Sequence, residues 1–301
     1  MANEKRLPKT AVLIVNAGSR KGAELFGKAR DGLAAGGIEL LDAKRVRSAR
    51  RISGYVKRAV KNAPMVILGG GDGTLSKNVD HFVGAKTVLA VLPLGTANSF
   101  ARTLGLPLDL DGAIEVITDG APRKIDLGAI DGDYFLNNAA LGLAPMVAES
   151  VPHGLKRRLG RLGYLLWASW SAANFKAFRL HVDDGRYKHR LWTTEARIAN
   201  GRFHGGLELI ESADLASGEL VVQAVIGRSV MKLAWSYLAS AFKVASRDKA
   251  VCEFKGKRLR IETRPRMPVS IDGELGPETP FEAWAVPDAI FVAAPKASTK
   301  G

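Results

Sequence analysis

Hydrophobic positions in the first 120 residues alternate between short continuous runs and helical spacing. Four runs, at 10–16, 38–43, 64–70 and 87–93, predict strands, and the continuous apolar run at 10–16 is typical of a strand buried on both faces of a sheet. The segments that follow them have apolar residues at helical spacing, and they lie at 22–37, 48–62, 75–84, 98–106 and 109–120. Strand and helix in turn predict a parallel sheet covered by helices.

Beyond residue 125 the hydrophobic period changes to two. Alternating segments lie at 124–143, 177–201, 218–227, 257–274 and 281–287, and turn signals such as Asp-Gly separate them. Two patches with helical spacing interrupt this pattern, at 153–175 and 229–243. We therefore predict an N-terminal α/β domain followed by an antiparallel, β-rich domain, with a boundary near residue 125.

Composition narrows the class of protein. The chain has 301 residues, 47% apolar and 25% charged, as in a soluble protein of two ordinary domains. Its single cysteine, Cys252, excludes a disulfide framework and a Cys-x-x-Cys metal site. The first apolar run is shorter than a signal-peptide core, and no apolar stretch approaches the length of a spanning helix. We expect a cytoplasmic protein.

The net charge of +14 predicts attraction to polyanions. Nucleic acid, an anionic membrane and phosphorylated ligands all fit this charge. No recognised nucleic-acid-binding motif accompanies it, so no nucleic-acid partner is expected.

Two glycine-containing turns follow buried strands, where parallel sheets bind ligands. The first is "GGGDGTL" at 69–75, in which bare backbone and a helix N-terminus suit phosphate groups. Asp72 would repel a bare phosphate, but it suits Mg²⁺ bound beside phosphates. The second turn, in "TVLAVLPLGTANSFAR", offers Gly95, Thr96 and Asn98. Neither a Walker A motif nor a G-x-G-x-x-G motif is present at these turns, which disfavours P-loop and dinucleotide folds.

A third stretch, "SIDGELG" at 270–276, carries a pair of carboxylates. Asp272 and Glu274 are two residues apart in an extended segment, so both can lie on one face. Such a pair can share the tasks of accepting a proton and orienting a metal or hydroxyl group. On its own, the stretch is equally typical of a surface hairpin.

Taken in order, "GGDGT" (70–74), "PLGTANSFAR" (93–102) and "IDGE" (271–274) resemble the diacylglycerol-kinase-type lipid kinases of bacteria. The superfamily includes sphingosine and ceramide kinases, and "VNAGSRKG" (15–22) is similar to its first motif. The resemblance covers nearly the whole chain. It implies an α/β nucleotide-binding domain with a parallel sheet over 1–125, an antiparallel β-sandwich over 126–280, and a segment 281–301 that returns to the first domain.

The resemblance also implies an activity, the ATP-dependent phosphorylation of a hydroxyl on a diacylglycerol-like lipid with Mg²⁺. The substrate would lie at an anionic membrane, with the enzyme bound peripherally to its surface. Whether the chain forms a homodimer is left open.

Site residues are carried over from the matching motifs. Those that would hold ATP are Asn16, Ala17, Gly18, Ser19, Arg20, Gly70, Gly71, Asp72, Gly73, Thr74, Leu75, Ser76, Gly95, Thr96 and Asn98. Asp72 and Asp126 would organise the metal. Glu274 is our choice as proton acceptor, with Asp272 as its neighbour and Asp72 completing the catalytic set, although the sequence leaves the choice between Glu274 and Asp272 open.

The chain departs from the family pattern at charged positions. Lys77 stands where the family usually has Glu, and Ser99 and Ser217 stand where it has Asp. Ser217 puts a second metal site in doubt. Two alternatives are therefore kept: a soluble-substrate kinase like the NAD kinases, and a non-catalytic nucleotide-binding protein of the membrane surface.

Overall fold

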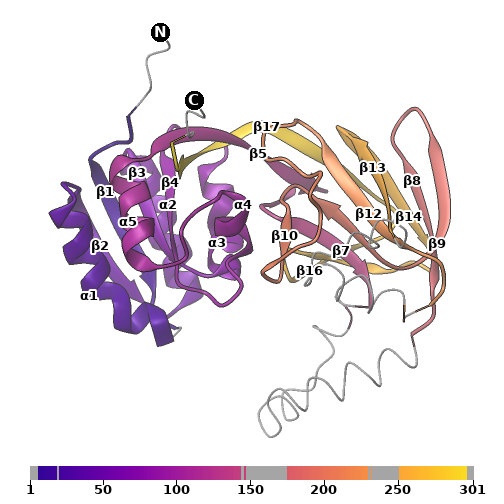
Figure 1. Cartoon of the computed structure of the whole chain (residues 1–301), viewed down its shortest axis with the longest axis horizontal. Coiled ribbons are helices and arrows are strands. Elements are labelled where there is room, and N and C mark those ends of the chain that lie inside the picture. The colour runs from indigo at the N-terminus through magenta and orange to yellow at the C-terminus, as the bar shows by residue number, and fades with distance from the viewer. Residues whose placement is uncertain are drawn as a thin grey trace, which may run out of the picture.

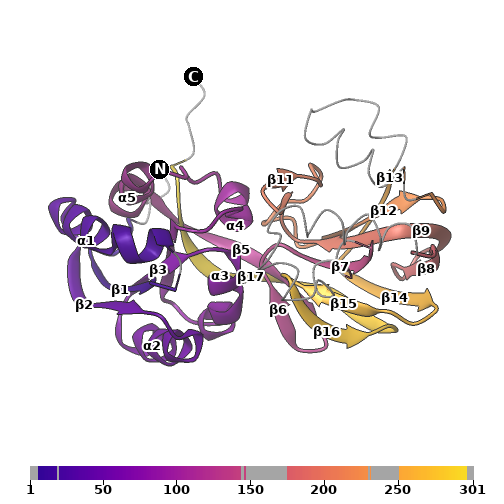
Figure 2. The same cartoon turned by 90° about the horizontal axis from the view of Figure 1, so that it is seen from below.

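The computed structural model describes residues 6–18, 20–143, 146, 175–229, 231 and 251–296. Two lobes lie side by side, an α/β lobe and a β lobe (Figures 1 and 2). The predicted fold class is confirmed, because parallel strands build the first lobe and antiparallel strands the second.

The first lobe is a parallel sheet with the strand order β4-β3-β1-β2. Its strands are β1 (Thr10–Asn16), β2 (Glu39–Val46), β3 (Met65–Gly70) and β4 (Val88–Pro93). Every residue of β3 and β4 is buried, as continuous apolar runs predict. Leu13 and Val15 belong to one hydrophobic cluster and Ile14 to another, so both faces of the sheet are covered.

Helices pack on both faces of this sheet. The helices are α1 (Arg20–Ala35), α2 (Ala49–Asn62), α3 (Asp72–Val79), α4 (Ser99–Thr103) and α5 (Leu110–Asp119), with a short 3₁₀ turn η1 (Asp80–Phe82). Helices α1 and α5 pack on one face of the sheet and α2 and α3 on the other, while α4 lies toward the β lobe beside the hairpin at 203–208. Ile52, Val56 and Ala59 of α2 are buried, as their spacing predicts.

The second lobe contains the antiparallel strands. They are β5 (Ala121–Ile130), β6 (Asp133–Phe135), β7 (Asn138–Gly142), β8 (Phe178–Asp183), β9 (Lys188–Ala199), β12 (Leu220–Ile226), β13 (Val251–Gly256), β14 (Arg258–Arg264), β15 (Pro268–Ile271), β16 (Glu274–Glu278) and β17 (Phe281–Ala294), with a hairpin of β10 (Phe203–His204) and β11 (Leu207–Glu208). Alternate residues of these strands form one core cluster. The predicted helical patches 153–175 and 229–243 lie almost wholly outside the described residues.

Asp-Gly turns join neighbouring strands at two places. Asp131 and Gly132 have φ angles of 48° and 100°, and Asp272 and Gly273 have 46° and 89°. Positive φ at both central positions is the geometry of a tight hairpin turn, and Asp-Gly is among its favoured sequences. The second of these turns carries the paired carboxylates of the sequence analysis.

Two long strands, β5 and β17, run through both lobes (Figure 1). They pair antiparallel from Ala121 opposite Ala294 to Ile130 opposite Ala283. At one end β17 joins β14, and at its other end it lies parallel to β4. The boundary expected at 125 therefore falls inside β5, and the exact domain limits stay a prediction. Across the described part of the chain, every helix falls short of the length and apolar character needed to cross a bilayer.

Candidate active site

The glycine turn after β3 leads directly into α3. The helix begins at Asp72, three residues earlier than the spacing predicts, and Gly71 is its N-cap. Gly71 offers no side chain to cap the first turn, and the backbone N–H groups of Thr74 and Leu75 bond to its carbonyl. A helix N-terminus of this kind favours a phosphate group.

Most of the glycines in this turn are required by packing within the protein. A Cβ on Gly70 would lie 2.6 Å from the side chain of Thr74, and a Cβ on Gly71 would lie 3.0 Å from the Cα of Gly95. A Cβ on Gly95 would in turn lie 2.5 Å from the Cα of Gly71. The two glycine turns therefore touch backbone to backbone. Gly73 differs from these glycines, because a Cβ there would meet open space.

Asp72 holds the two turns together. Its Oδ2 accepts a hydrogen bond from the backbone N–H of Ser99 at 3.0 Å, and its Oδ1 accepts one from Phe100 at 3.0 Å. The carboxylate thus satisfies the free N–H groups at the start of α4. A carboxylate has about four acceptor positions, so capacity remains for a ligand.

Asn98 braces the second turn from within. It adopts a left-handed conformation with φ 49°, and its Oδ1 accepts from the N–H of Gly95 at 2.9 Å. Its Nδ2 donates to the carbonyls of Pro93 and Gly95. Asn98 is buried, whereas Thr96 is exposed. The backbone and Thr96 are thus the parts of this turn that face outward.

The first motif lies beside the glycine turn. Asn16 donates through Nδ2 to the hydroxyl of Thr74 at 2.9 Å, and its Oδ1 accepts from the N–H of Gly18 at 2.9 Å. Ala17 is buried and bonds to the carbonyl of Val46 through its backbone. Ser19 and the side chain of Arg20 lie outside the described residues.

Two further residues of the glycine turn have distinct surroundings. Leu75 is buried in the core of the first lobe, so its side chain faces away from the turn. Ser76, on the next position of α3, is half-buried.

The β lobe brings Asp272 to the same place. Its carboxylate accepts three backbone hydrogen bonds, from Leu136 at 2.7 Å and from Asn137 and Asn138 at 3.1 Å each. Burial raises the pKa of Asp272 to about 6 against the opposing effect of these hydrogen bonds, and the charge of Asp72 raises it further. Asp72 and Asp272, from different lobes, therefore lie within electrostatic reach of each other.

Glu274 also reaches across the lobes. It forms an ion pair with Lys77 of α3, and both side chains are about half exposed. Lys77 is the position where the family pattern has an acid. The sequence showed the altered charge but not its partner, because the two residues meet only when the lobes are joined.

Asp126 has a different environment. It is 4% exposed, and its carboxylate accepts from the N–H of Gly218 at 2.6 Å and from that of Asp288 at 2.9 Å. These contacts tie β5 to the 213–218 loop and to β17. In the described residues, no three side chains of His, Cys, Asp or Glu are grouped closely enough to hold a metal. The assignment of Mg²⁺ to Asp72 and Asp126 together stays a prediction.

Two residues that join distant segments near the site were not predicted as site residues. The hydroxyl of Ser99 accepts from the N–H of Gly206 at 3.2 Å, which joins α4 to the β10–β11 hairpin. Asn200 donates through Nδ2 to the carbonyls of Asp126 and Leu136. A lone Ser or Asn gives no sequence signal for such a role, because both partners are backbone atoms of distant segments.

Known protein families match both lobes. The "Diacylglycerol kinase catalytic domain" model matches residues 10–130, and the "YegS C-terminal NAD kinase beta sandwich-like domain" model matches residues 138–294. A relative from Chromohalobacter salexigens named "Probable lipid kinase YegS-like" is 30% identical over 240 residues, which cover 77% of this chain and 76% of the relative. A relative from Bacillus subtilis named "Diacylglycerol kinase" is 28% identical over 252 residues, covering 79% and 80%.

Solved structures from Bacillus anthracis have the same fold. A crystal structure named as that of a diacylglycerol kinase superposes with a TM-score of 0.74 at 18% identity, covering 96% of this chain and 98% of its own. A second superposes with a TM-score of 0.80 at 23% identity over 98% of both chains. Because the two family models match in chain order and the sequence relatives cover most of the chain, this protein belongs to the diacylglycerol kinase family of lipid kinases.

Proposed function

We propose that this protein transfers the γ-phosphoryl group of ATP to a hydroxyl group of a diacylglycerol-like lipid. The observation that carries the proposal is the meeting of α3 with the 272–274 turn. Glu274 pairs with Lys77, and Asp272 lies within electrostatic reach of Asp72. The N-terminus of α3, where we place the phosphates, and the carboxylates of the other lobe would then face one another, as transfer between two substrates requires.

We place ATP on the first lobe. Its phosphates would lie against the N-terminus of α3 and the exposed backbone around Gly73 and Thr96. When bound, Mg²⁺ would neutralise charge on the transferring phosphoryl group. Asp72 fits as a ligand, because its carboxylate keeps free acceptor positions beside the phosphate site. Asp126 fits less well, since its carboxylate is enclosed and occupied by two backbone N–H groups.

Glu274 would accept the proton of the lipid hydroxyl. The hydroxyl oxygen then bonds to the γ-phosphorus, the bond from that phosphorus to the ADP oxygen breaks, and the proton moves to the carboxylate of Glu274. Asp272 is less suited to this step, because its oxygens hold three backbone N–H groups. We assign Asp272 to holding the turn that presents Glu274.

Transfer of labelled phosphate from ATP to lipids in mixed micelles tests the proposal. Glu274→Gln keeps the shape of the side chain and removes the proton acceptor, so turnover should fall roughly 10²–10⁴-fold while ATP still binds. Lys77→Gln is the matched control, because it breaks the same ion pair but keeps the carboxylate. It should retain most of the activity.

Three outcomes would contradict the proposal. An equal loss in Lys77→Gln and Glu274→Gln would mean that joining the lobes, and not proton transfer, is the role of Glu274. Phosphorylation of NAD without that of any lipid would indicate a soluble-substrate kinase. ATP binding without transfer to any acceptor in the panel would indicate a non-catalytic protein.

A further inference from the structure

The outer face of β8, β9 and β14 carries a grid of charged side chains. Phe178, Leu180 and Val182 of β8 point into the core of the β lobe, so the alternate residues of this strand point outward. Register then places each outward residue of β8 between one residue of β14 and one of β9. This face belongs neither to the glycine turns nor to the 272–274 turn.

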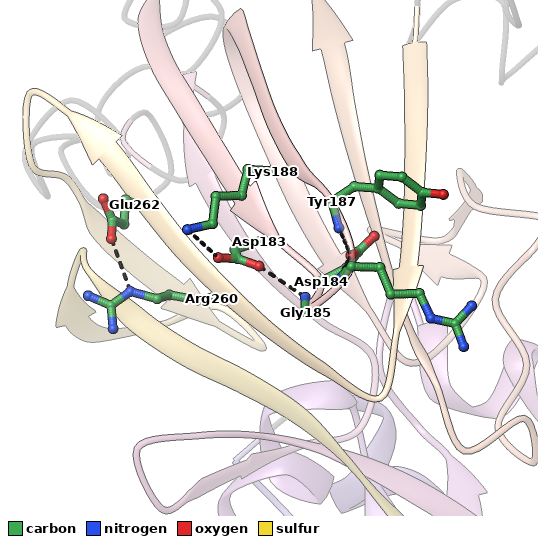
Figure 3. Close-up of polar contacts among 8 residues, drawn as sticks. Asp183, Asp184, Gly185, Tyr187, Lys188, Arg260 and Glu262 are labelled. Carbon is green, nitrogen blue, oxygen red and sulfur yellow. Dashed lines mark hydrogen bonds and ion pairs between the residues drawn. The ribbon is translucent and has the colours of Figure 1, made fainter.

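Two cations near the hairpin end of this face are paired with carboxylates. Arg260 pairs with Glu262 through a 3.0 Å contact, and Lys188 pairs with Asp183 at 3.5 Å (Figure 3). The carboxylate of Asp183 also accepts from the N–H of Gly185. Both cations that Figure 3 labels, Lys188 and Arg260, therefore have a carboxylate partner.

The row at the opposite end is not balanced. Arg264 of β14 lies directly opposite Arg179 of β8, and Arg179 lies opposite Trp192 of β9. Like charges in directly opposed positions of an antiparallel sheet destabilise it. Two guanidinium groups approach the Trp192 ring, that of Arg179 at 5.0 Å and that of Arg228 at 3.7 Å from its centroid.

Arg190 adds another positive charge beside this row. Among the residues that the structure describes, no carboxylate forms an ion pair with Arg179, Arg190 or Arg264. All three are exposed, and they line a pocket of about 350 Å³ together with His181, Leu191 and Trp192. Burial lowers the pKa of His181, and the charges of Arg190, Arg264 and Arg179 lower it further, against the opposing charge of Glu262.

We propose that Arg179, Arg190 and Arg264, with Trp192, form a binding site for a phosphate group outside the catalytic site. Guanidinium groups bind phosphate through paired, charge-assisted hydrogen bonds. An anion there would also remove the repulsion between Arg179 and Arg264. The phosphate can come from a phospholipid headgroup or from a soluble phosphate compound, and the same side chains serve both.

Binding of the full chain to two probes tests this site, and neither measurement depends on kinase activity. The first probe is vesicles of phosphatidylcholine with and without phosphatidylglycerol, and the second is inorganic pyrophosphate. The double variant Arg179→Gln/Arg264→Gln should weaken binding at least roughly tenfold for the probe that the pocket recognises. Pyrophosphate bound elsewhere gives an equal background in every variant.

The matched control is Arg258→Gln/Arg260→Gln. It removes the same charge from the same sheet, but from residues that pair with Glu282 and Glu262. Loss of vesicle binding in the test variant alone assigns the pocket to a lipid phosphate, and loss of pyrophosphate binding assigns it to a soluble one. Equal losses in test and control, or no loss in either, would overturn the site and leave net charge as the cause.

Discussion

At the scale of single residues, Asp272 is the clearest pH-sensitive group of the candidate site. Burial raises its pKa from 3.8 to about 6, so the folded state keeps this proton at pH values where the unfolded state has lost it. Asp272 should therefore make its full contribution to the free energy of unfolding below about pH 4. This contribution should be lost as the pH rises through about 6. The expected fall from this group is on the order of 1–3 kcal/mol.

Denaturant unfolding at about pH 4 and pH 7 measures this effect as the difference between wild type and Asp272→Asn. In the variant, the part of the decrease in the free energy of unfolding between about pH 4 and pH 7 that Asp272 causes should be absent. Asp131→Asn is the matched control, since Asp131 occupies the other Asp-Gly turn with a similar φ but is exposed. An Asp272→Asn curve parallel to wild type would show that the carboxyl is not held in this way.

The roles of individual carboxylates could be predicted from the sequence only in part. The motif identified Asp72 as a site residue, and the structure places it at the glycine turn. Its two hydrogen-bond partners, Ser99 and Phe100, were not predicted. They belong to another loop, and their contribution is backbone N–H, which carries no sequence signature.

At the scale of elements, the two glycine turns form one unit. Gly71→Ala places a Cβ 3.0 Å from the Cα of Gly95 and should force the turns apart, at a cost of about 1–3 kcal/mol in the free energy of unfolding. The affinity of Gly71→Ala for ATP should also fall. Gly73→Ala has open space around its Cβ and lies in a helix, so it should be neutral or stabilise by about 0.4–1 kcal/mol.

Denaturant unfolding and ATP titration of both variants check this contrast. Under the proposed function, Gly73→Ala weakens ATP binding without loss of stability, because the added methyl group faces the phosphates. If Gly71→Ala is as stable as wild type, the contact between the turns does not constrain the site. Equal ATP affinity in Gly73→Ala and wild type would remove Gly73 from the phosphate site.

Periodicity predicted the described helices and strands of the first lobe well, because most of them bury one stripe or one continuous run, although β2 buries only Val46. The start of α3 was placed too late. Asp-Gly-Thr is a turn-like sequence, and it becomes helical here because Gly71 accepts the backbone N–H bonds of Thr74 and Leu75. Helix propensity of the residues themselves does not predict this start, because the N-cap, Gly71, is positioned by the preceding strand β3.

At the scale of the whole molecule, Asp126 fastens segments from distant parts of the chain. Asp126→Asn replaces one carboxylate oxygen by an amide NH₂ that faces a backbone N–H group. The free energy of unfolding should fall by about 1–3 kcal/mol, with or without Mg²⁺. Asp288→Asn is the control, because the exposed side chain of Asp288 changes while its backbone N–H still donates to Asp126.

Denaturant unfolding of these variants with and without Mg²⁺ decides between two roles for Asp126. An equal loss of unfolding free energy with and without Mg²⁺ would support a purely structural role for Asp126. A stabilisation by Mg²⁺ that is present in wild type and absent from Asp126→Asn would instead support the metal role that the family resemblance implies.

By itself, the sequence determined the order of strands and helices, the change from α/β to antiparallel β, and the motifs that mark the family. These follow from hydrophobic period and from short stretches of contiguous residues. Only the tertiary structure decided that Lys77 pairs with Glu274, that Asp126 is closed off by two backbone N–H groups, and that Arg264 lies opposite Arg179. Each of these depends on strand register or on the joining of the two lobes, because the partners are far apart in the chain and meet only when the sheets are assembled.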